Sequence, residues 1–262
     1  MMRLLTAGRK AALPMELQFD GATDCGYLRT NNEDHFFLSR DDDDVAGRGW
    51  LFAVADGLGG QPAGEVASRF MVDALVNFYG DDLPGGEMSS GASLERLVRA
   101  ASRRIYEAGI DNTAQRGMGT TCTIGHFKEA LLTIVHVGDS RLYRFRHGTL
   151  RQLTEDQTLA EALVKRGEIA RAEAANHPGR HILFHSIGGE ELDEVFVKEH
   201  VVESGDRYLL CTDGLNEMLS DDHIAALLAH HRQPANAVRK LIKKANKAGG
   251  TDNITVIVVD VM

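Results

Sequence analysis

Short apolar runs rich in β-branched residues recur along the chain, and this pattern is typical of strands buried in a sheet. Such runs predict strands at 35–38, 50–55, 120–127, 131–137, 141–145, 195–202, 207–212 and 254–260. Only short polar segments interrupt 120–137 and 141–153, so each of these two stretches predicts a β-hairpin.

Apolar residues spaced three and four positions apart predict helices elsewhere. The predicted helices cover 64–79, 93–108, a weaker case at 155–166, and two segments after residue 220. Ser93 is a plausible N-cap of the second helix, and Ser220 of the segment "DDHIAALLAHH". Pro234 can open the last helix, which Gly249–Gly250 can close.

The order of these elements indicates the fold class. Strands come in adjacent groups and helices in pairs, without the regular alternation that a doubly wound parallel sheet requires. We therefore expect antiparallel sheets covered by helices, an α+β layered domain.

Composition narrows the class of protein. The chain has 262 residues, of which 43% are hydrophobic and 26% charged, as in one globular domain. Its net charge of −9 disfavours nucleic acid as a partner. The first residues lack a signal-peptide core, and no apolar run approaches the roughly 18 residues of a membrane span. We expect a cytoplasmic protein without a membrane segment. The three cysteines form no C-x-x-C pair, so neither a disulfide framework nor a zinc site is indicated.

Four aspartates stand at the ends of strongly apolar predicted strands, each within two residues of a glycine: Asp56, Asp139, Asp213 and Asp252. Asp-Gly pairs can simply make turns. If the strand ends converge, however, clustered carboxylates require a cation. Oxygen ligands without His or Cys favour Mg²⁺ or Mn²⁺, and the Gly57 carbonyl could add a ligand. Two such ions can share a water and lower its pKa.

The segment "RTNNED" adds a further candidate. Arg29 beside a metal site could hold phosphate oxygens through two donors. Glu33 and Asp34 could orient metal-bound waters. Taken alone, this string is more typical of a solvated loop.

Taken together, these residues resemble the metal-dependent PP2C-type serine/threonine protein phosphatases, in particular short bacterial members. The matching segments run in the family's order over about residues 20–260: "RTNNED", "VADGLGG", "GTT", "VGDSRLYR", "LTEDQT", "LLCTDGL" and "GGTDNITVIVV". The resemblance implies a four-layer α-β-β-α sandwich, with two antiparallel sheets between helix pairs and the metals at one end. The phosphatase domain would span 16–262, after an N-terminal extension at 1–15 that could be disordered.

The resemblance also implies roles for the site residues. Asp56 would bridge two Mn²⁺ or Mg²⁺ ions, Gly57 would ligate the first, and Asp213 and Asp252 would complete the second. Asp139, with Asp213, would hold a third, weaker ion. Arg29 would bind phosphate, and Glu33 and Asp34 would orient metal waters. The implied reaction is hydrolysis of phosphoserine and phosphothreonine on proteins, opposing a bacterial Ser/Thr kinase, by a monomeric enzyme.

Two positions depart from relatives of this family. Leu58 stands where animal members carry a histidine proposed as general acid, so the proton donor is unidentified. Gln157 stands where many relatives have histidine. Residues 155–190 match a mobile flap beside the active site. There His177, Arg180 and His181 could contact substrate, although we interpret them as ordinary surface residues.

Other phosphatase and nucleotide-binding classes fit less well. No cysteine is followed by the C-x-x-x-x-x-R pattern of cysteine-dependent phosphatases, and Glu65 stands where a P-loop needs lysine. A D-x-D-x-V string within the acidic run at 41–45 has no supporting element. A catalytically inactive phosphoprotein-binding scaffold on the same fold remains an alternative, which the presence of all four aspartates disfavours.

Overall fold

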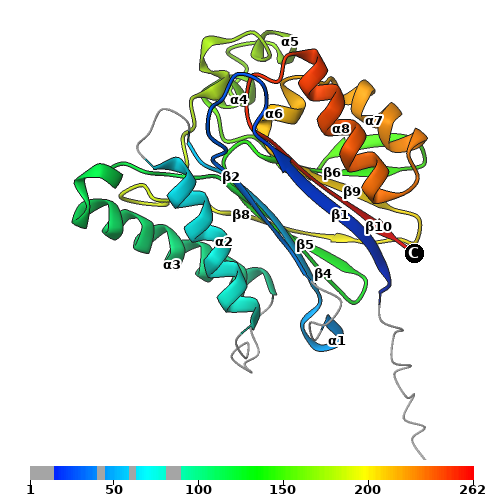
Figure 1. The fold of residues 1–262 in the computed structure, drawn as a ribbon, viewed down its shortest axis with the longest axis horizontal. Helices are drawn as coiled ribbons and strands as arrows, with labels where there is room; N and C mark the ends of the chain where they lie inside the picture. The colour runs from blue at the N-terminus through cyan, green and yellow to red at the C-terminus, as the bar shows by residue number, and fades with distance from the viewer. Residues whose placement is uncertain (1–14, 40–44, 59–62, 81–89) are drawn as a thin grey trace, which may run out of the picture.

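The computed structural model describes residues 15–39, 45–58, 63–80 and 90–262. Two five-stranded antiparallel sheets stack against each other, with helices on both outer faces (Figure 1). The predicted four-layer α+β sandwich is thus confirmed. The predicted extension at 1–15 lies outside the described residues except for Met15. None of the described helices has the length and apolar character to cross a membrane.

Each sheet joins strands that are far apart in the sequence. The first sheet has the order β1 (Leu17–Asp24), β10 (Ile254–Val261), β9 (Arg207–Cys211), β6 (Arg141–Arg146) and β7 (Thr149–Gln152). The second has the order β2 (Asp34–Leu38), β3 (Trp50–Asp56), β4 (Cys122–Lys128), β5 (Leu131–Val137) and β8 (Phe196–Val201). The hairpins β4–β5 and β6–β7 were both predicted.

Pairs of long helices cover the sheets. Figure 1 shows α2 (Gly64–Gly80) and α3 (Ser90–Asp111) beside the second sheet, and α7 (Asp221–His230) and α8 (Pro234–Ala248) beside the first. The shorter helices are α1 (Val45–Arg48), η1 (Thr113–Gln115), α4 (Leu159–Lys165), α5 (Arg171–Ala174), η2 (Pro178–His181) and α6 (Asp213–Asn216).

Strand β3 illustrates why the central strands read as continuous apolar runs. Phe52 and Val54 pack between the two sheets, whereas Leu51 and Ala53 pack under α2 and α3. Successive side chains of a strand point to opposite faces, and both faces of this strand are buried. The sandwich therefore has three apolar layers, one between the sheets and one under each helix pair.

Most predicted element boundaries agree with the structure. Ser220 caps α7 by accepting from the His223 N–H, and Pro234 lies in the first turn of α8. The assignment of Ser93 as an N-cap was wrong, because α3 begins at Ser90 and buries Gly91 in its first turn. Strand β1 was not predicted, since this edge strand is only partly buried and carries no continuous apolar run.

The antiparallel order brings particular strand ends together. Because β4 lies antiparallel between β3 and β5, those two strands end at the same edge of the second sheet. In the first sheet, β9 ends where the antiparallel β10 begins. These two edges face one another, since the Asp34 carboxylate of β2 accepts a hydrogen bond from the Thr255 hydroxyl of β10 at 2.7 Å.

Candidate metal centre

The four predicted aspartates meet at one pocket. A cavity of about 840 Å³ is lined by Asp56, Asp139, Asp213 and Asp252. Gly57, Arg29 and the flap residues Arg180 and His181 line the same cavity. The prediction that the strand ends converge is therefore correct, although these aspartates are up to 196 residues apart in the chain.

Burial and the charges of neighbouring carboxylates raise the pKa values of Asp56, Asp139 and Asp213. Burial is the largest cause of the raised pKa of Asp56, followed by the charges of Asp34, Asp213 and Asp139. The pKa of Asp213 is raised by burial and then by Asp139 and Asp252. Burial, with the charge of a further aspartate, raises the pKa of Asp139 to about 7. A bound cation would lower these pKa values, because it stabilises the ionised carboxylates.

Two carboxylate oxygens in this region have no hydrogen-bond donor. Asp213 Oδ1 and Asp34 Oδ1 are both buried, and the described residues supply neither of them with a partner. Buried polar atoms are nearly always satisfied by protein, water or an ion. The pocket offers carboxylate and backbone carbonyl oxygens, the donor set that suits Mg²⁺ or Mn²⁺. The residues present thus fit the divalent ions that the sequence predicted.

The end of β3 is fixed by two threonines of the "GTT" segment. The Asp56 N–H donates to Thr121 Oγ1 at 3.1 Å. The Asp56 carbonyl accepts from Thr120 Oγ1 and from the Thr121 N–H, both at 2.8 Å. These hydrogen bonds hold the backbone of Asp56 in place, so that its carboxylate lines the pocket. The role of the threonines was not foreseen, although their segment belongs to the family resemblance.

Asp34 lies behind the pocket and does not line it. Its Oδ2 accepts from the hydroxyls of Thr212 at 2.8 Å and Thr255 at 2.7 Å. Its side chain is 4% exposed, and burial outweighs these hydrogen bonds and raises its pKa to about 6. Asp34 is thus placed to position its strand partner Asp56. Glu33 is also outside the pocket lining, and its carbonyl accepts from the Gly57 N–H at 3.1 Å.

Arg29 reaches the pocket from the loop after β1. Its Nη2 donates to Asp252 Oδ2 at 2.8 Å, and its side chain is 39% exposed. The loop is held by Asn253, whose side chain donates to the carbonyls of Cys25 and Asn31, both at 2.9 Å. The sequence analysis missed Asn253, which directly follows Asp252 in the "TDN" string.

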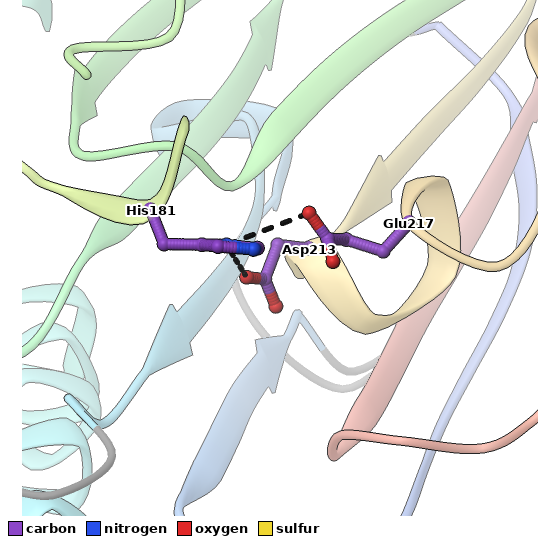
Figure 2. Close-up of side chains that lie close together, drawn as sticks. All are labelled: His181, Asp213 and Glu217. Atoms are coloured by element: carbon purple, nitrogen blue, oxygen red, sulfur yellow. Dashed lines mark ion pairs between the residues drawn. The ribbon is translucent and has the colours of Figure 1, made fainter. Parts of the chain in front are cut away.

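The flap contributes side chains to the same pocket. Figure 2 shows His181 facing Asp213 and Glu217, with Nδ1 3.9 Å from Asp213 Oδ2 and 3.5 Å from Glu217 Oε1. The ligand atoms of these three residues lie within 4.8 Å of one another, a spacing that could hold a cation. Arg180 Nε also lies 3.5 Å from Glu217 Oε1.

Arg180 and His181 are exposed, as expected for surface residues, but they also line the pocket, so their contact with substrate stays a prediction. His177 has a local role, since its Nδ1 accepts from the Gly179 N–H at 3.0 Å and caps η2. Glu217 was missed by the sequence analysis. Its position four residues after Asp213 places it one helical turn further along the same side, and this is the signal that could have identified it.

The two positions that depart from the family have different places in the structure. Leu58 lines the pocket, where it offers no titratable group. Gln157 does not replace a catalytic group. Its Oε1 accepts from the Gly138 N–H at 2.8 Å and so fixes the turn that precedes Asp139.

Known proteins are similar to this chain in sequence and fold. The protein phosphatase 2C profile matches residues 29–247. The chain is 38% identical over 252 residues to the serine/threonine protein phosphatase PstP of Mycobacterium tuberculosis, covering 96% of this chain and 46% of that protein. It thus spans about half the length of that curated relative. Identity to the serine/threonine phosphatase stp of Listeria welshimeri is 34% over 243 residues, covering 91% of this chain and 93% of the relative.

A solved structure matches the fold closely. The crystal structure of the catalytic domain of PstP in complex with two manganese ions superposes with a TM-score of 0.82 at 37% identity. The match covers 95% of this chain and 99% of that one. The profile spans most of the chain, the fold matches, and the aspartates gather at one end of the sandwich. This chain therefore belongs to the protein phosphatase 2C family.

Proposed function

We propose that this protein hydrolyses phosphoserine and phosphothreonine on proteins by means of a water activated at a binuclear Mn²⁺ or Mg²⁺ centre. The observation that carries the proposal is the pocket in which Asp56, Asp139, Asp213 and Asp252 gather beside the Arg29 guanidinium, with the buried Asp213 Oδ1 lacking a hydrogen-bond partner among the described residues. The names of the relatives, all serine/threonine phosphatases where described above, support the same reaction.

The ligand roles proposed here are those that the family resemblance implies, and each residue named lines the pocket. Asp56 would bridge the two ions, because each of its oxygens can serve a different ion from the end of β3. The Gly57 carbonyl would be a ligand of the first ion, and Asp213 and Asp252 would be ligands of the second. The bound ions would supply a water of lowered pKa as the nucleophile. Asp139, together with Asp213, would hold a third ion on the side of the pocket that His181 and Glu217 reach.

The remaining residues would bind and orient the phosphate. Arg29 would exchange its contact with Asp252 for two phosphate oxygens, since a guanidinium presents parallel donors that match this geometry. Asp34, held by two threonine hydroxyls, would fix Asp56 and orient water on the ions. Glu33 would support the same water shell through the loop it shares with Asp34.

The biological partners proposed here are those that the family resemblance implies. The substrates would be phosphorylated proteins, and the enzyme would oppose a bacterial Ser/Thr kinase. An open pocket lined by polar side chains fits a phosphorylated side chain presented by a flexible segment. The pocket also lies where the flap segment reaches the strand ends, so a substrate protein would contact flap residues.

The test measures hydrolysis of p-nitrophenyl phosphate and of a phosphothreonine peptide with Mn²⁺, Mg²⁺ or a chelator. We expect metal-dependent turnover that Asp56→Asn and Asp213→Asn each abolish. The control is Asp73→Asn, which removes an exposed carboxylate of α2 that does not line the pocket and should leave turnover unchanged.

Two results would count against the proposal. Turnover that persists in the chelator would exclude metal-activated water. An absence of turnover with either ion, combined with retained phosphopeptide binding, would instead support the inactive scaffold.

A further inference from the structure

The outer face of α8 carries only positive charge. Its 15 residues include five lysines and arginines and no acidic residue, in a chain whose net charge is −9. At about 100° per residue these five positions fall on one sector of the helix. Val238, Leu241 and Ala245 on the opposite sector are buried against the first sheet. The exposed residues, here called the α8 basic face, are Arg239, Lys240, Lys243, Lys244 and Lys247.

These charges are not balanced within the described part of the chain. No described carboxylate forms an ion pair with any of the five, and Arg239 donates only to the Asn236 side chain of its own helix, at 2.7 Å. The face also places like charges four residues apart at Arg239–Lys243, Lys240–Lys244 and Lys243–Lys247. Like charges at this spacing destabilise a helix. The repulsion among these cations therefore lowers the stability of the helix, and a bound anionic partner would offset that repulsion.

The C-terminal end of α8 lies a few residues before the metal pocket in the chain. After α8, the chain passes through Gly249–Gly250 to Thr251 and Asp252, which both line that pocket. In Figure 1, α8 and β1 lie side by side, and the loop after β1 lies at the end of the sandwich where α8 ends.

A groove of about 510 Å³ lies between α8 and β1, lined by Arg239 and Lys243 on the helix side and by Tyr27 in the loop after β1. The Tyr27 N–H donates to the Gly250 carbonyl at 2.7 Å, and two residues later Arg29 lines the metal pocket. The same loop therefore borders both cavities, with the side chain of Tyr27 70% exposed between them.

The strand side of the groove carries two carboxylates, Asp20 and Asp24, and neither forms an ion pair with a described cation. Asp24 Oδ1 accepts from the Gly26 N–H at 2.9 Å and from Asn246 Nδ2 at 3.0 Å, so this carboxylate is already engaged. Asp20 lies on the same side of the groove, but no described cation pairs with it. Because the cations project from the helix, an anionic ligand would lie along α8.

We propose that the α8 basic face and its groove bind an acidic segment of the substrate protein, adjacent in its sequence to the phosphorylated residue in the metal pocket. The segment would be rich in Asp, Glu or further phosphorylated residues. This inference rests on the proposed phosphatase function and adds a substrate preference to it. Since the contact is between exposed charges, it would raise the rate of association with the substrate and lower KM. Salt would screen the charges and so weaken both effects.

The experiment compares three phosphothreonine peptides that differ only in flanking residues: Asp/Glu, Ala/Ser or Lys/Arg. The test variant is Lys243→Gln/Lys244→Gln/Lys247→Gln, since glutamine keeps a similar helix propensity while removing charge. The matched control, Arg96→Gln/Arg103→Gln/Arg104→Gln, removes three exposed charges from α3 on the opposite side of the sandwich. Turnover of p-nitrophenyl phosphate reports on the metal centre itself.

We expect the wild type to prefer the acidic peptide, and the α8 variant to lose about tenfold in kcat/KM for it at low salt, through KM. Hydrolysis of p-nitrophenyl phosphate and of the Ala/Ser peptide should stay within about twofold, and high salt should remove the difference. The α3 variant should resemble the wild type.

Several outcomes would overturn the inference while leaving the phosphatase function intact: no wild-type preference, equal losses on all peptides, or an equal loss in the α3 variant. Lysine-dependent co-sedimentation with phosphatidylglycerol vesicles, without a peptide effect, would assign the α8 basic face to a membrane surface instead. If no substrate is hydrolysed at all, the proposed function fails. Anisotropy of the labelled acidic peptide would then still report whether the three lysines bind it.

Discussion

Asp34 and Asp56 stand directly opposite each other on the antiparallel strands β2 and β3. Asp34 is also bonded to the hydroxyls of Thr212 and Thr255 from the other sheet. Two neighbouring carboxyl groups therefore lie where the edges of both sheets meet, with Asp34 buried and Asp56 half-buried. The repulsion between these two groups is small when one of them is protonated or when a cation lies beside them. In the metal-free protein the site should therefore lower the free energy of unfolding as the pH rises.

A pH dependence of stability follows for the metal-free protein. The pKa values of Asp34 and Asp139 are raised from 3.8 to about 6 and about 7, and burial and mutual repulsion also raise those of Asp56 and Asp213 well above 3.8. Between the unfolded and folded pKa values the folded chain binds more protons than the unfolded one. Raising the pH from about 4 to about 7 should therefore lower the free energy of unfolding.

Urea denaturation of chelator-treated protein across this pH range measures the effect. Asp213→Asn should flatten the slope and raise the stability of the metal-free protein at neutral pH, although it abolishes activity. Excess Mn²⁺ should reverse the slope for the wild type. A metal-free protein that gains stability between these pH values would contradict the clustering of protonated carboxyl groups.

Arg29→Ala should impair substrate binding rather than metal binding. The guanidinium contacts Asp252 in the absence of phosphate, and both side chains are partly exposed, so the contact contributes little to stability. We expect KM for phosphopeptide to rise by about tenfold or more, while the number of bound manganese ions stays the same. Arg29→Lys should recover only part of the loss, because lysine lacks the planar pair of donors.

Steady-state kinetics together with metal analysis of the purified variants separate the two roles of Arg29. A variant that loses manganese on dialysis alongside its activity would show that Arg29 supports the ligand Asp252, and the assignment to phosphate would be wrong.

Gly57→Ala should damage the metal centre by displacing the end of β3. A Cβ at this position would lie 2.4 Å from the Gly64 carbonyl oxygen and 2.7 Å from that of Glu33, and neither backbone atom can move easily. We expect the free energy of unfolding to fall by about 1–3 kcal/mol. Turnover should fall by about a hundredfold, because a displacement near 1 Å misplaces the ligands.

Gly189→Ala is the matched comparison, since its Cβ would meet its nearest neighbours at an ordinary 3.7 Å. Calorimetry and turnover of both variants measure the difference. Near-wild-type activity of Gly57→Ala would mean that close backbone packing at this strand end does not set the ligand geometry.

The sequence by itself determined the elements that carry the site. Buried central strands must be apolar on both faces, so runs such as 50–55 and 131–137 can be predicted as strands from the sequence. The same runs show that Asp56 and Asp139 are acids at strand ends. The edge strand β1 escaped prediction because one side of it meets solvent and its pattern is mixed. The boundary of α3 was misplaced because a small-residue turn such as "SGA" gives little periodic signal.

Only the tertiary structure decided which side chains share the pocket. His181 and Arg180 come from a short helix of the flap, Glu217 from the turn after β9, and Asn253 holds the loop that carries Arg29. Apart from the four-residue spacing of Glu217 from Asp213, no local pattern encodes these contacts, because they form only when segments distant in the chain are brought together. Residue type and strand period are local properties of the chain, whereas the convergence of distant charges is a property of the packed sandwich.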